Sequence, residues 1–159
     1  MASETFPYSK SAFILNMVVL TILIAATVLV LFVITTEIIY IAMILAIEAT
    51  LLMVLGASPF LTAHEVTKDT LILRQGWYFK ARIPLSNVKK ASRLEKGPLR
   101  MGVFFRLFSS TLYVTARRTD LIEVELKEAM TFSLALGKRA DRVVFDAQDP
   151  QRLISRLER

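Results

Sequence analysis

The sequence predicts a membrane protein with an N-terminal two-helix transmembrane hairpin, followed by a mainly β domain that ends in an α-helix. Three patterns predict this fold class: two long apolar runs, a period-two alternation from residue 63 onward, and an amphipathic stripe near the C-terminus. We place the division at residue 60, with the tail and hairpin in residues 1–60 and the β domain in residues 61–159. The second part is long enough for one small domain with its own core.

The apolar runs cover residues 13–36 and 38–57 and contain no Lys or Arg. Their 24 and 20 residues suit helices that cross a hydrocarbon core roughly 30 Å thick. One continuous helix would be more than twice as long as that core, so we expect a reversal at Thr35, Thr36 and Glu37. The first run is longer than the apolar region of a signal peptide and no cleavage site follows it, so we expect it to be retained.

The charges beside the hairpin predict its orientation. Lys10 precedes the hairpin, Lys68 and Arg74 follow it, and the connection carries Glu37. Because Lys and Arg concentrate on the cytoplasmic side, we predict a multi-pass protein of the cell membrane. Both termini and the β domain should be cytoplasmic.

Two polar residues lie inside the hairpin: Asn16 near the cytoplasmic end of the first helix and Glu48 about halfway along the second. An ionisable side chain near the midplane costs about 3 kcal/mol. Glu48 therefore serves proton or cation passage, contacts another protomer, or is a protonated acid bonded to Thr21 or Thr27. We favour the last two alternatives, because two helices alone do not enclose a pathway. Asn16 is the other candidate for an intramembrane polar contact.

Alternation and turn residues predict short strands in the β domain. The expected strands cover residues 64–67, 70–74, 77–83, 85–94, 111–116, 121–126 and 142–145. Gln75 and Gly76 should form a tight turn with positive φ at the glycine. Residues 117–120 should join the strands on either side as a hairpin loop. The structures of residues 99–110 and 127–136 are left open.

The strand at residues 77–83 alternates most regularly. Its odd-numbered side chains should face the core: Trp77, Phe79, Ala81 and Ile83. Its even-numbered side chains should face outward: Tyr78, Lys80 and Arg82.

The C-terminal helix has a clear start. Asp149 is a good N-cap, and Pro150 suits the first helical position. Leu153, Ile154 and Leu157 form an apolar stripe. So short a helix is marginal in isolation, and we expect the stripe to dock on the strands.

Positive charge is concentrated in the β domain. The formal net charge is +6 for the chain, +8 for residues 61–159 and +10 for residues 74–118. A basic surface beside an anionic leaflet gains roughly 1 kcal/mol for each Lys or Arg that comes close. The alternative is a positively charged surface that meets only solvent. The candidate contacts with anionic headgroups are Arg74, Tyr78, Lys80, Arg82, Arg100 and Arg106.

Aromatic residues alternate with arginines in residues 99–108. Phe104, Phe105 and Phe108 lie close to Arg100 and Arg106. Such a stretch could enter the headgroup region, stack on nucleic acid bases, or pack in the core. We favour packing, because bulky apolar residues in a small β domain are more often interior.

Enzyme signatures are missing from the sequence. The one histidine, His64, has no partners at the spacing of a metal site or a catalytic triad, and the five glycines form no phosphate loop. The absence of Cys excludes disulfides and thiolate metal sites. We therefore expect a protein that is not an enzyme and needs no cofactor or metal, with His64 at a strand edge or an interface.

Three stretches carry a resemblance to a known family: residues 64–77 (HEVTKDTLILRQGW), 81–88 (ARIPLSNV) and 144–154 (VFDAQDPQRLI). With the hairpin, they resemble the bacterial and archaeal PH-like (pleckstrin-homology-type) domain membrane proteins. The resemblance implies a PH-like barrel of about seven antiparallel strands with a C-terminal capping helix, often in oligomers and without catalytic residues. Arg74, Lys80 and Arg82 are similar to the basic pattern of phosphoinositide-binding domains, but we expect solvent or a generic anionic headgroup there.

These observations predict a membrane-anchored, non-enzymatic PH-like module for protein or anionic-lipid interaction at the cytoplasmic membrane surface. Its expected partners are membrane lipids and a second copy or another protein. One alternative is a scaffolding subunit of a larger membrane complex. A membrane-tethered nucleic-acid binder is less favoured, and a steep salt dependence would identify it.

Overall fold

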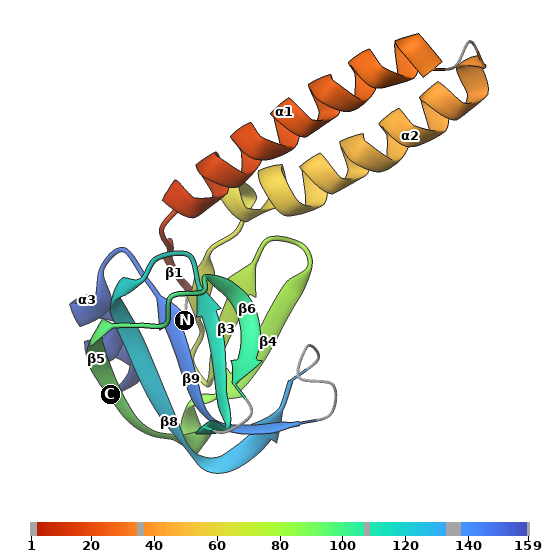
Figure 1. Ribbon diagram of the computed structural model, residues 1–159. Helices are drawn as coiled ribbons and strands as arrows, with labels where there is room; N and C mark the ends of the chain where they lie inside the picture. The colour runs from red at the N-terminus through yellow and green to blue at the C-terminus, as the bar shows by residue number, and fades with distance from the viewer. Residues whose placement is uncertain (1–2, 35–36, 107–108, 133–137, 159) are drawn as a thin grey trace.

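The two apolar runs form a pair of long helices that project from a β-rich domain (Figure 1). The computed structural model describes residues 3–34, 37–106, 109–132 and 138–158. Helix α1 covers Ser11–Ile34 and α2 covers Ile38–Leu51, followed by a π-helical segment, Leu52–Ala57, and a 3₁₀ turn, Ser58–Leu61. The segments Ser11–Leu31 and Ile38–Leu61 are long and apolar enough to cross a membrane. The expected reversal includes residues 35–36, which lie outside the described residues.

The helices pack most closely at the base of the hairpin, next to the β domain. Gly56 is buried there, and a Cβ on it would lie 3.0 Å from Met17 Cγ. Ser58 is fully buried, and its hydroxyl donates to the Val54 carbonyl. Pro59 lies in the first turn of the 3₁₀ segment, and the helix ends shortly after it because proline cannot donate to a continuing ladder.

The first sheet contains four antiparallel strands in the order β1-β2-β3-β4. Their bounds are β1 Glu4–Phe6, β2 His64–Val66, β3 Thr70–Gln75 and β4 Phe79–Pro84. Strand β1 comes from the tail ahead of α1, whereas β2 follows α2. The tail is therefore built into the β domain, and the first sheet joins chain from both ends of the hairpin.

The second sheet contains five strands in the order β5-β8-β9-β7-β6. Their bounds are β5 Val88–Lys96, β6 Gly102–Arg106, β7 Thr111–Thr115, β8 Thr119–Thr131 and β9 Arg139–Asp146. Strands β7 and β9 are parallel, and the other pairs are antiparallel. The described residues thus form nine strands in two separate sheets, one of them mixed. The expectation of about seven strands, all antiparallel, is wrong, and no closed barrel is formed within the described residues.

The second sheet is mixed because β9 lies between β7 and β8. We expected residues 117–120 to close a hairpin between β7 and β8, but β9 lies between these two strands (Figure 1). Strands β7 and β8 run in opposite directions and β9 pairs antiparallel with β8. Strand β9 must then be parallel to β7, and its pairing with a sequence-distant strand could not be read from local alternation.

One core lies between the two sheets. It is formed mainly by alternate residues of the strands, including Leu71, Leu73, Phe79, Ala81, Ile83, Leu112, Val114, Val124, Val143 and Phe145. Helix α3 (Pro150–Leu157) lies against β5 and β8. Leu153 and Leu157 are buried and Ile154 packs against the same core, which confirms that the apolar stripe docks on the strands.

Trp77 is an exception to the predicted alternation. It is 58% exposed, because β4 begins only at Phe79 and residues 76–78 form the turn before it. Gly76 has a φ of +61°, and a Cβ there would lie 2.5 Å from Ser58 Oγ. The turn thus requires glycine both for its conformation and for its close approach to the end of the hairpin.

Residues 99–110 and 127–136, whose structure we could not predict from the sequence, also contain strands. Residues 127–131 continue β8, and the Phe-rich stretch supplies β6. Phe105 packs against the core between the sheets, while Phe104 stacks on Tyr113 on the other face of the second sheet, with ring centroids 4.9 Å apart. Phe108 and residues 133–137 lie outside the described residues.

Candidate membrane interface

A hydrogen-bonded network joins the tail, the end of the hairpin and the β3–β4 turn. The Tyr8 hydroxyl donates to the Pro59 carbonyl, contacts Thr62 Oγ1 at 2.7 Å, and accepts from the Gly76 amide. Lys10 Nζ donates to the carbonyls of Pro59 and Thr62 and lies 3.6 Å from the centre of the Tyr8 ring. These bonds hold the first turn of α1 and the last turn of the hairpin at one end of the β domain.

Burial affects the titration of this network. It raises the pKa of Tyr8 and lowers the pKa of Lys10 to about 8, although the nearby Asp146 carboxylate partly opposes the second shift. Lys10 is the charge on which the predicted orientation of the first helix depends, and it is held at the hairpin base by two carbonyl oxygens.

His64 connects the two sheets. Its Nδ1 accepts from the Arg74 amide at 3.2 Å, and its Nε2 lies 3.1 Å from the Asp146 carbonyl. Because a carbonyl only accepts, Nε2 carries the proton and the ring is neutral. Burial lowers the pKa of His64 to about 3. The expectation of a strand-edge or interfacial histidine is wrong: β2 lies between β1 and β3, and His64 is 1% exposed.

Asp146 lies at the end of β9 and binds two chain segments through its carboxylate. One oxygen accepts from the Ser9 amide at 2.9 Å and the other from the Ala116 amide at 2.6 Å. Burial raises the pKa of Asp146, although these bonds and the nearby Arg117 guanidinium act in the opposite direction. The carboxylate thus joins the tail, β9 and the end of β7, a structural role that occupies its oxygens.

Exposed apolar side chains of the β domain gather at the end that carries the hairpin. Among the described residues from 62 onward, the large hydrophobic side chains exposed to solvent are Trp77 (58%), Leu99 (82%) and Met101 (38%). The Trp77 amide donates to Ser58 Oγ at the hairpin base, and Leu99 and Met101 line a cavity with Phe13 of α1. With Phe60 and Leu61, exposed at the end of the second apolar segment, they form a surface that we call the apolar rim.

The six predicted headgroup contacts do not form one surface. Arg74 pairs with Glu65 (Nη2 to Oε1, 3.5 Å), and Tyr78 is partly buried against the core rather than pointing outward. Lys80 and Arg82 are exposed on β4. Arg100 lies beside the apolar rim with its guanidinium over Phe104, whereas Arg106 lies at the opposite end of β6 from Gly102.

The two intramembrane candidates lie apart from each other. Asn16 is exposed on α1 and lines the cavity at the base of the hairpin. Glu48 lies on α2, and its Oε2 is buried without a hydrogen-bond partner among the described residues. The hydroxyls of Thr21 and Thr27 donate to carbonyls of their own helix. The contact between Glu48 and another protomer stays a prediction.

The cavity at the hairpin base, here called the junction cavity, has a volume of about 240 Å³. Its described lining residues are Ala12, Phe13, Asn16, Gln75, Tyr78, Leu99, Met101, Gly102, Thr115, Ala116 and Arg118. They come from α1, the β3–β4 turn, β6 and its approach, and the end of β7. Sequence reasoning missed Gln75, Leu99, Met101, Thr115 and Arg118 because these distant segments meet only in the folded chain.

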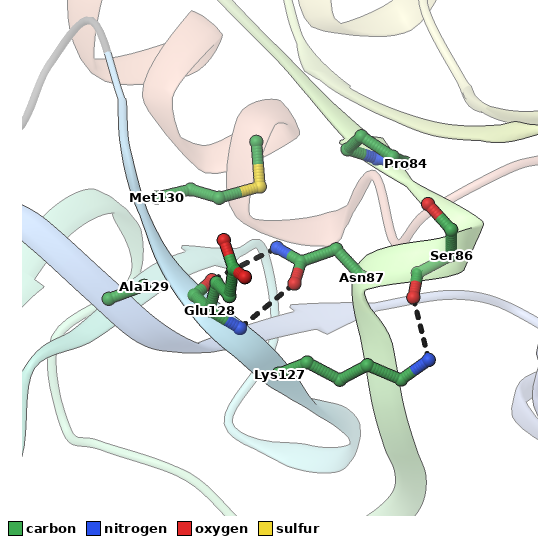
Figure 2. A pocket seen from close by; sticks show the side chains of 7 residues that line it. All are labelled: Pro84, Ser86, Asn87, Lys127, Glu128, Ala129 and Met130. Carbon is green, nitrogen blue, oxygen red and sulfur yellow. Dashed lines mark hydrogen bonds between the residues drawn. The ribbon is translucent and has the colours of Figure 1, made fainter.

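A larger groove of about 420 Å³ lies elsewhere, between the β4–β5 connection and β8 (Figure 2). Its polar groups bind one another. The Asn87 amide donates to the Glu128 carbonyl and accepts from the Glu128 amide, and Lys127 Nζ donates to the Ser86 carbonyl. These bonds hold the β4–β5 connection against β8. We therefore assign them a structural role and do not treat the groove as a binding site.

The described residues contain no cluster of three or more His, Cys, Asp or Glu that could hold a metal ion. Comparisons with models of protein families, with curated proteins and with solved structures found no match to this chain.

Proposed function

We propose that this protein is a membrane-anchored, non-enzymatic module whose β domain rests on the cytoplasmic surface of the cell membrane. Its apolar rim would lie among lipid headgroups, and Arg100 and Arg118 beside the rim would attract anionic lipids. The observation that carries the proposal is the gathering of Trp77, Leu99 and Met101 at the end that bears the hairpin.

The apolar rim lies at the end of the β domain that bears the hairpin. Exposed apolar side chains scattered singly over a protein need no explanation, but a group of them at one end indicates an interaction surface. Here the group lies beside the first turn of a helix that is long and apolar enough to cross a membrane. Tryptophan is enriched at the membrane interface, and nearby arginines gain roughly 1 kcal/mol each from an anionic leaflet.

Two features support the proposed orientation. Strand β1 pairs with β2 across the hairpin, so the tail and the β domain occupy the same side of any membrane that the two helices cross. Lys10 lies at that end of the hairpin, whereas the described part of the opposite end carries Glu37. The positive-inside rule favours a cytoplasmic location for the end with Lys10.

The PH-like resemblance belongs to the proposal as well. Two sheets around one core with a docked C-terminal helix support it. The parallel pair β7–β9 departs from the all-antiparallel barrel that the resemblance implies. A role at the membrane surface depends on the rim and not on this classification.

Trp77 provides a direct test, because it is the single tryptophan of the chain. We expect the full chain in nanodiscs of phosphatidylcholine and phosphatidylglycerol to show blue-shifted tryptophan emission, quenched by lipids brominated near the headgroup. Reversing both charges in Arg100→Glu, Arg118→Glu should reduce the quenching in phosphatidylglycerol nanodiscs, because the mutated rim is repelled from an anionic surface.

The matched control moves the tryptophan to the far end of β6. In a Trp77→Phe, Arg106→Trp variant, brominated lipids should not quench the emission, whereas aqueous iodide should. If Trp77 itself responds to iodide and not to brominated lipid, the rim lies in water. The proposal would then be wrong, and a rim that binds another protein would become the better explanation.

A further inference from the structure

Two residues that line the junction cavity, Gln75 and Thr115, have buried polar atoms that no part of the described chain satisfies. Gln75 is 2% exposed, and neither its Oε1 nor its Nε2 has a hydrogen-bond partner; Thr115 is 1% exposed, and its Oγ1 has none. Both residues line the cavity. Leaving such groups unsatisfied is costly, and most buried polar groups in proteins are paired with protein, water or a ligand. Three unpaired atoms at one cavity indicate an occupant with hydrogen-bonding groups.

The polar residues that line the cavity indicate which chemical groups that occupant carries. An amide and a hydroxyl can both donate and accept, so Gln75 and Thr115 suit neutral groups such as hydroxyls or ester carbonyls. Arg118 is exposed and adds a positive charge, Asn16 adds a second amide, and the described lining contains no carboxylate. This set favours an anionic ligand and disfavours a cationic one.

The position and size of the cavity narrow the choice further. Its walls include Ala12 and Phe13 in the first turn of α1, which is the level of the headgroups if α1 crosses the membrane. Its volume of about 240 Å³ is below the 300–1,000 Å³ typical of sites for drug-sized ligands. The cavity can therefore enclose a small polar group, while acyl chains would stay in the bilayer.

We propose that the junction cavity binds the phosphoglycerol group of an anionic membrane lipid. Gln75 and Thr115 hydrogen-bond the glycerol oxygens, and Arg118 binds the phosphate. This inference rests on the proposed function, since it requires the hairpin base at headgroup level. It adds a defined site with a ligand class, whereas the rim alone makes only general contact with the surface.

The test uses the delipidated full-length protein in detergent and follows thermal unfolding by circular dichroism. A ligand that binds only the folded state raises the melting temperature, and the rise grows with the logarithm of its concentration relative to its Kd. We expect short-chain phosphatidylglycerol to raise the melting temperature of the wild type more than short-chain phosphatidylcholine does. Glycerol 3-phosphate is the third probe: a matching shift would identify a soluble phosphoglycerol compound as an equivalent source of the ligand.

The key variants are Gln75→Leu and Thr115→Val, which remove the unpaired atoms. Each lost hydrogen bond should weaken phosphatidylglycerol binding roughly two- to tenfold, so the lipid-dependent shift should shrink or disappear. Without lipid, both variants should melt no lower than the wild type, because they remove unsatisfied polar atoms. Thr111→Val is the matched control: Thr111 is equally buried on β7, but its hydroxyl donates to the Ser109 carbonyl, and it does not line the cavity. This variant should keep the full lipid response.

Two results would overturn the inference. One is an equal response of the wild type to phosphatidylglycerol and phosphatidylcholine; the other is an unchanged phosphatidylglycerol response in both cavity variants, which would leave the cavity to water. The quenching of Trp77 by brominated lipid separates this failure from that of the proposed function. A quenched Trp77 with no cavity-dependent shift would retain the membrane-surface role and remove only the lipid site.

Discussion

At the scale of single residues, His64 and Asp146 determine where the two sheets and the tail meet. His64 joins β3 to β9 through its two ring nitrogens, and the Asp146 carboxylate joins the Ser9 and Ala116 amides. Both side chains are held by backbone groups of segments that are distant in the sequence. The one histidine of the chain thus has a structural role.

The low pKa of His64 predicts acid-sensitive stability. A histidine that stays neutral when folded stabilises the native state fully above its unfolded pKa of ~6.5 and loses that contribution as pH falls towards its folded pKa of about 3. Lowering the pH from 7 to 5 should therefore reduce the free energy of unfolding by roughly 2 kcal/mol through this group. Melting temperatures of the full chain in detergent, measured across this range, would show the loss.

A His64→Gln variant isolates this contribution. Its amide can donate to Asp146 and accept from Arg74, yet it does not titrate. Asp146 acts in the opposite direction, because its pKa is raised in the folded state, so its stabilising contribution is present at low pH and is lost as pH rises through that pKa. Both proteins share this effect, and the variant should lose less stability than the wild type between pH 7 and pH 5. Parallel pH profiles would contradict the assignment.

Side-chain positions were predictable where a regular strand contains them. Alternation correctly gave Phe79, Ala81 and Ile83 as buried, but it failed at Trp77, where a turn with positive φ precedes the strand. The unpaired side chains of Gln75 and Thr115 could not be predicted, because their burial depends on α1 and β6 lying beside them.

At the scale of elements, α3 and β1 stabilise each other through direct contacts. Glu4 of β1 forms ion pairs with Arg152 (Oε1 to Nη2, 2.6 Å) and Arg156 (Oε2 to Nε, 3.7 Å) of α3, and the Arg152 guanidinium lies over the Phe6 ring. The Asp149 carboxylate caps α3 by accepting from the Arg152 amide. Ion pairs at this exposure contribute little on their own, so the buried side chains must supply most of the stability.

Truncating Leu153 should test the docking of α3. This side chain is fully buried in the core between the sheets, and a buried Leu→Ala change costs about 2–5 kcal/mol. We expect Leu153→Ala to lower the melting temperature of the full chain clearly. Gln151→Ala, on the exposed side of the same helix, should change it little. Equal melting of both variants would mean that α3 is not docked.

Elements with a local signal were predicted from the sequence, and elements that depend on distant partners were not. The apolar runs predicted the two helices, and Asp149 with Pro150 predicted the start of α3. Strand β1 has only three residues and gains its stability from β2 and α3. The insertion of β9 between β7 and β8 is likewise a long-range pairing, which alternation does not encode.

At the scale of the whole molecule, the hairpin projects from one fixed end of the β domain (Figure 1). The network of Tyr8, Lys10 and Thr62 lies between the two parts without a flexible linker. If both helices span, the rim cannot move far from the headgroups. Proximity to the membrane would then be a fixed property of the folded protein, while the charges beside the rim would determine how closely the rim approaches the headgroups.

Cysteine labelling should establish the topology, because the chain has no cysteine of its own. In intact cells, an impermeant thiol reagent should label Glu37→Cys at the far end of the hairpin. It should not label Ser3→Cys or Lys90→Cys, because these exposed positions lie on the β-domain side and we predict that side to be cytoplasmic. Labelling of both positions in permeabilised cells is the positive control. Labelling of Lys90→Cys in intact cells would show that the orientation is opposite to the predicted one.

The pairing of β1 with β2 also imposes an order of events during synthesis. Strand β1 is translated before either helix and β2 only after both, so the first sheet has to wait for the completed hairpin. A chain whose tail had been translocated across the membrane would leave β2 with an unpaired edge and Phe6 missing from the core. If the two helices cross a membrane, their correct insertion is thus a precondition for a finished domain, and a misinserted chain would expose an unfinished sheet to the cell's proteases.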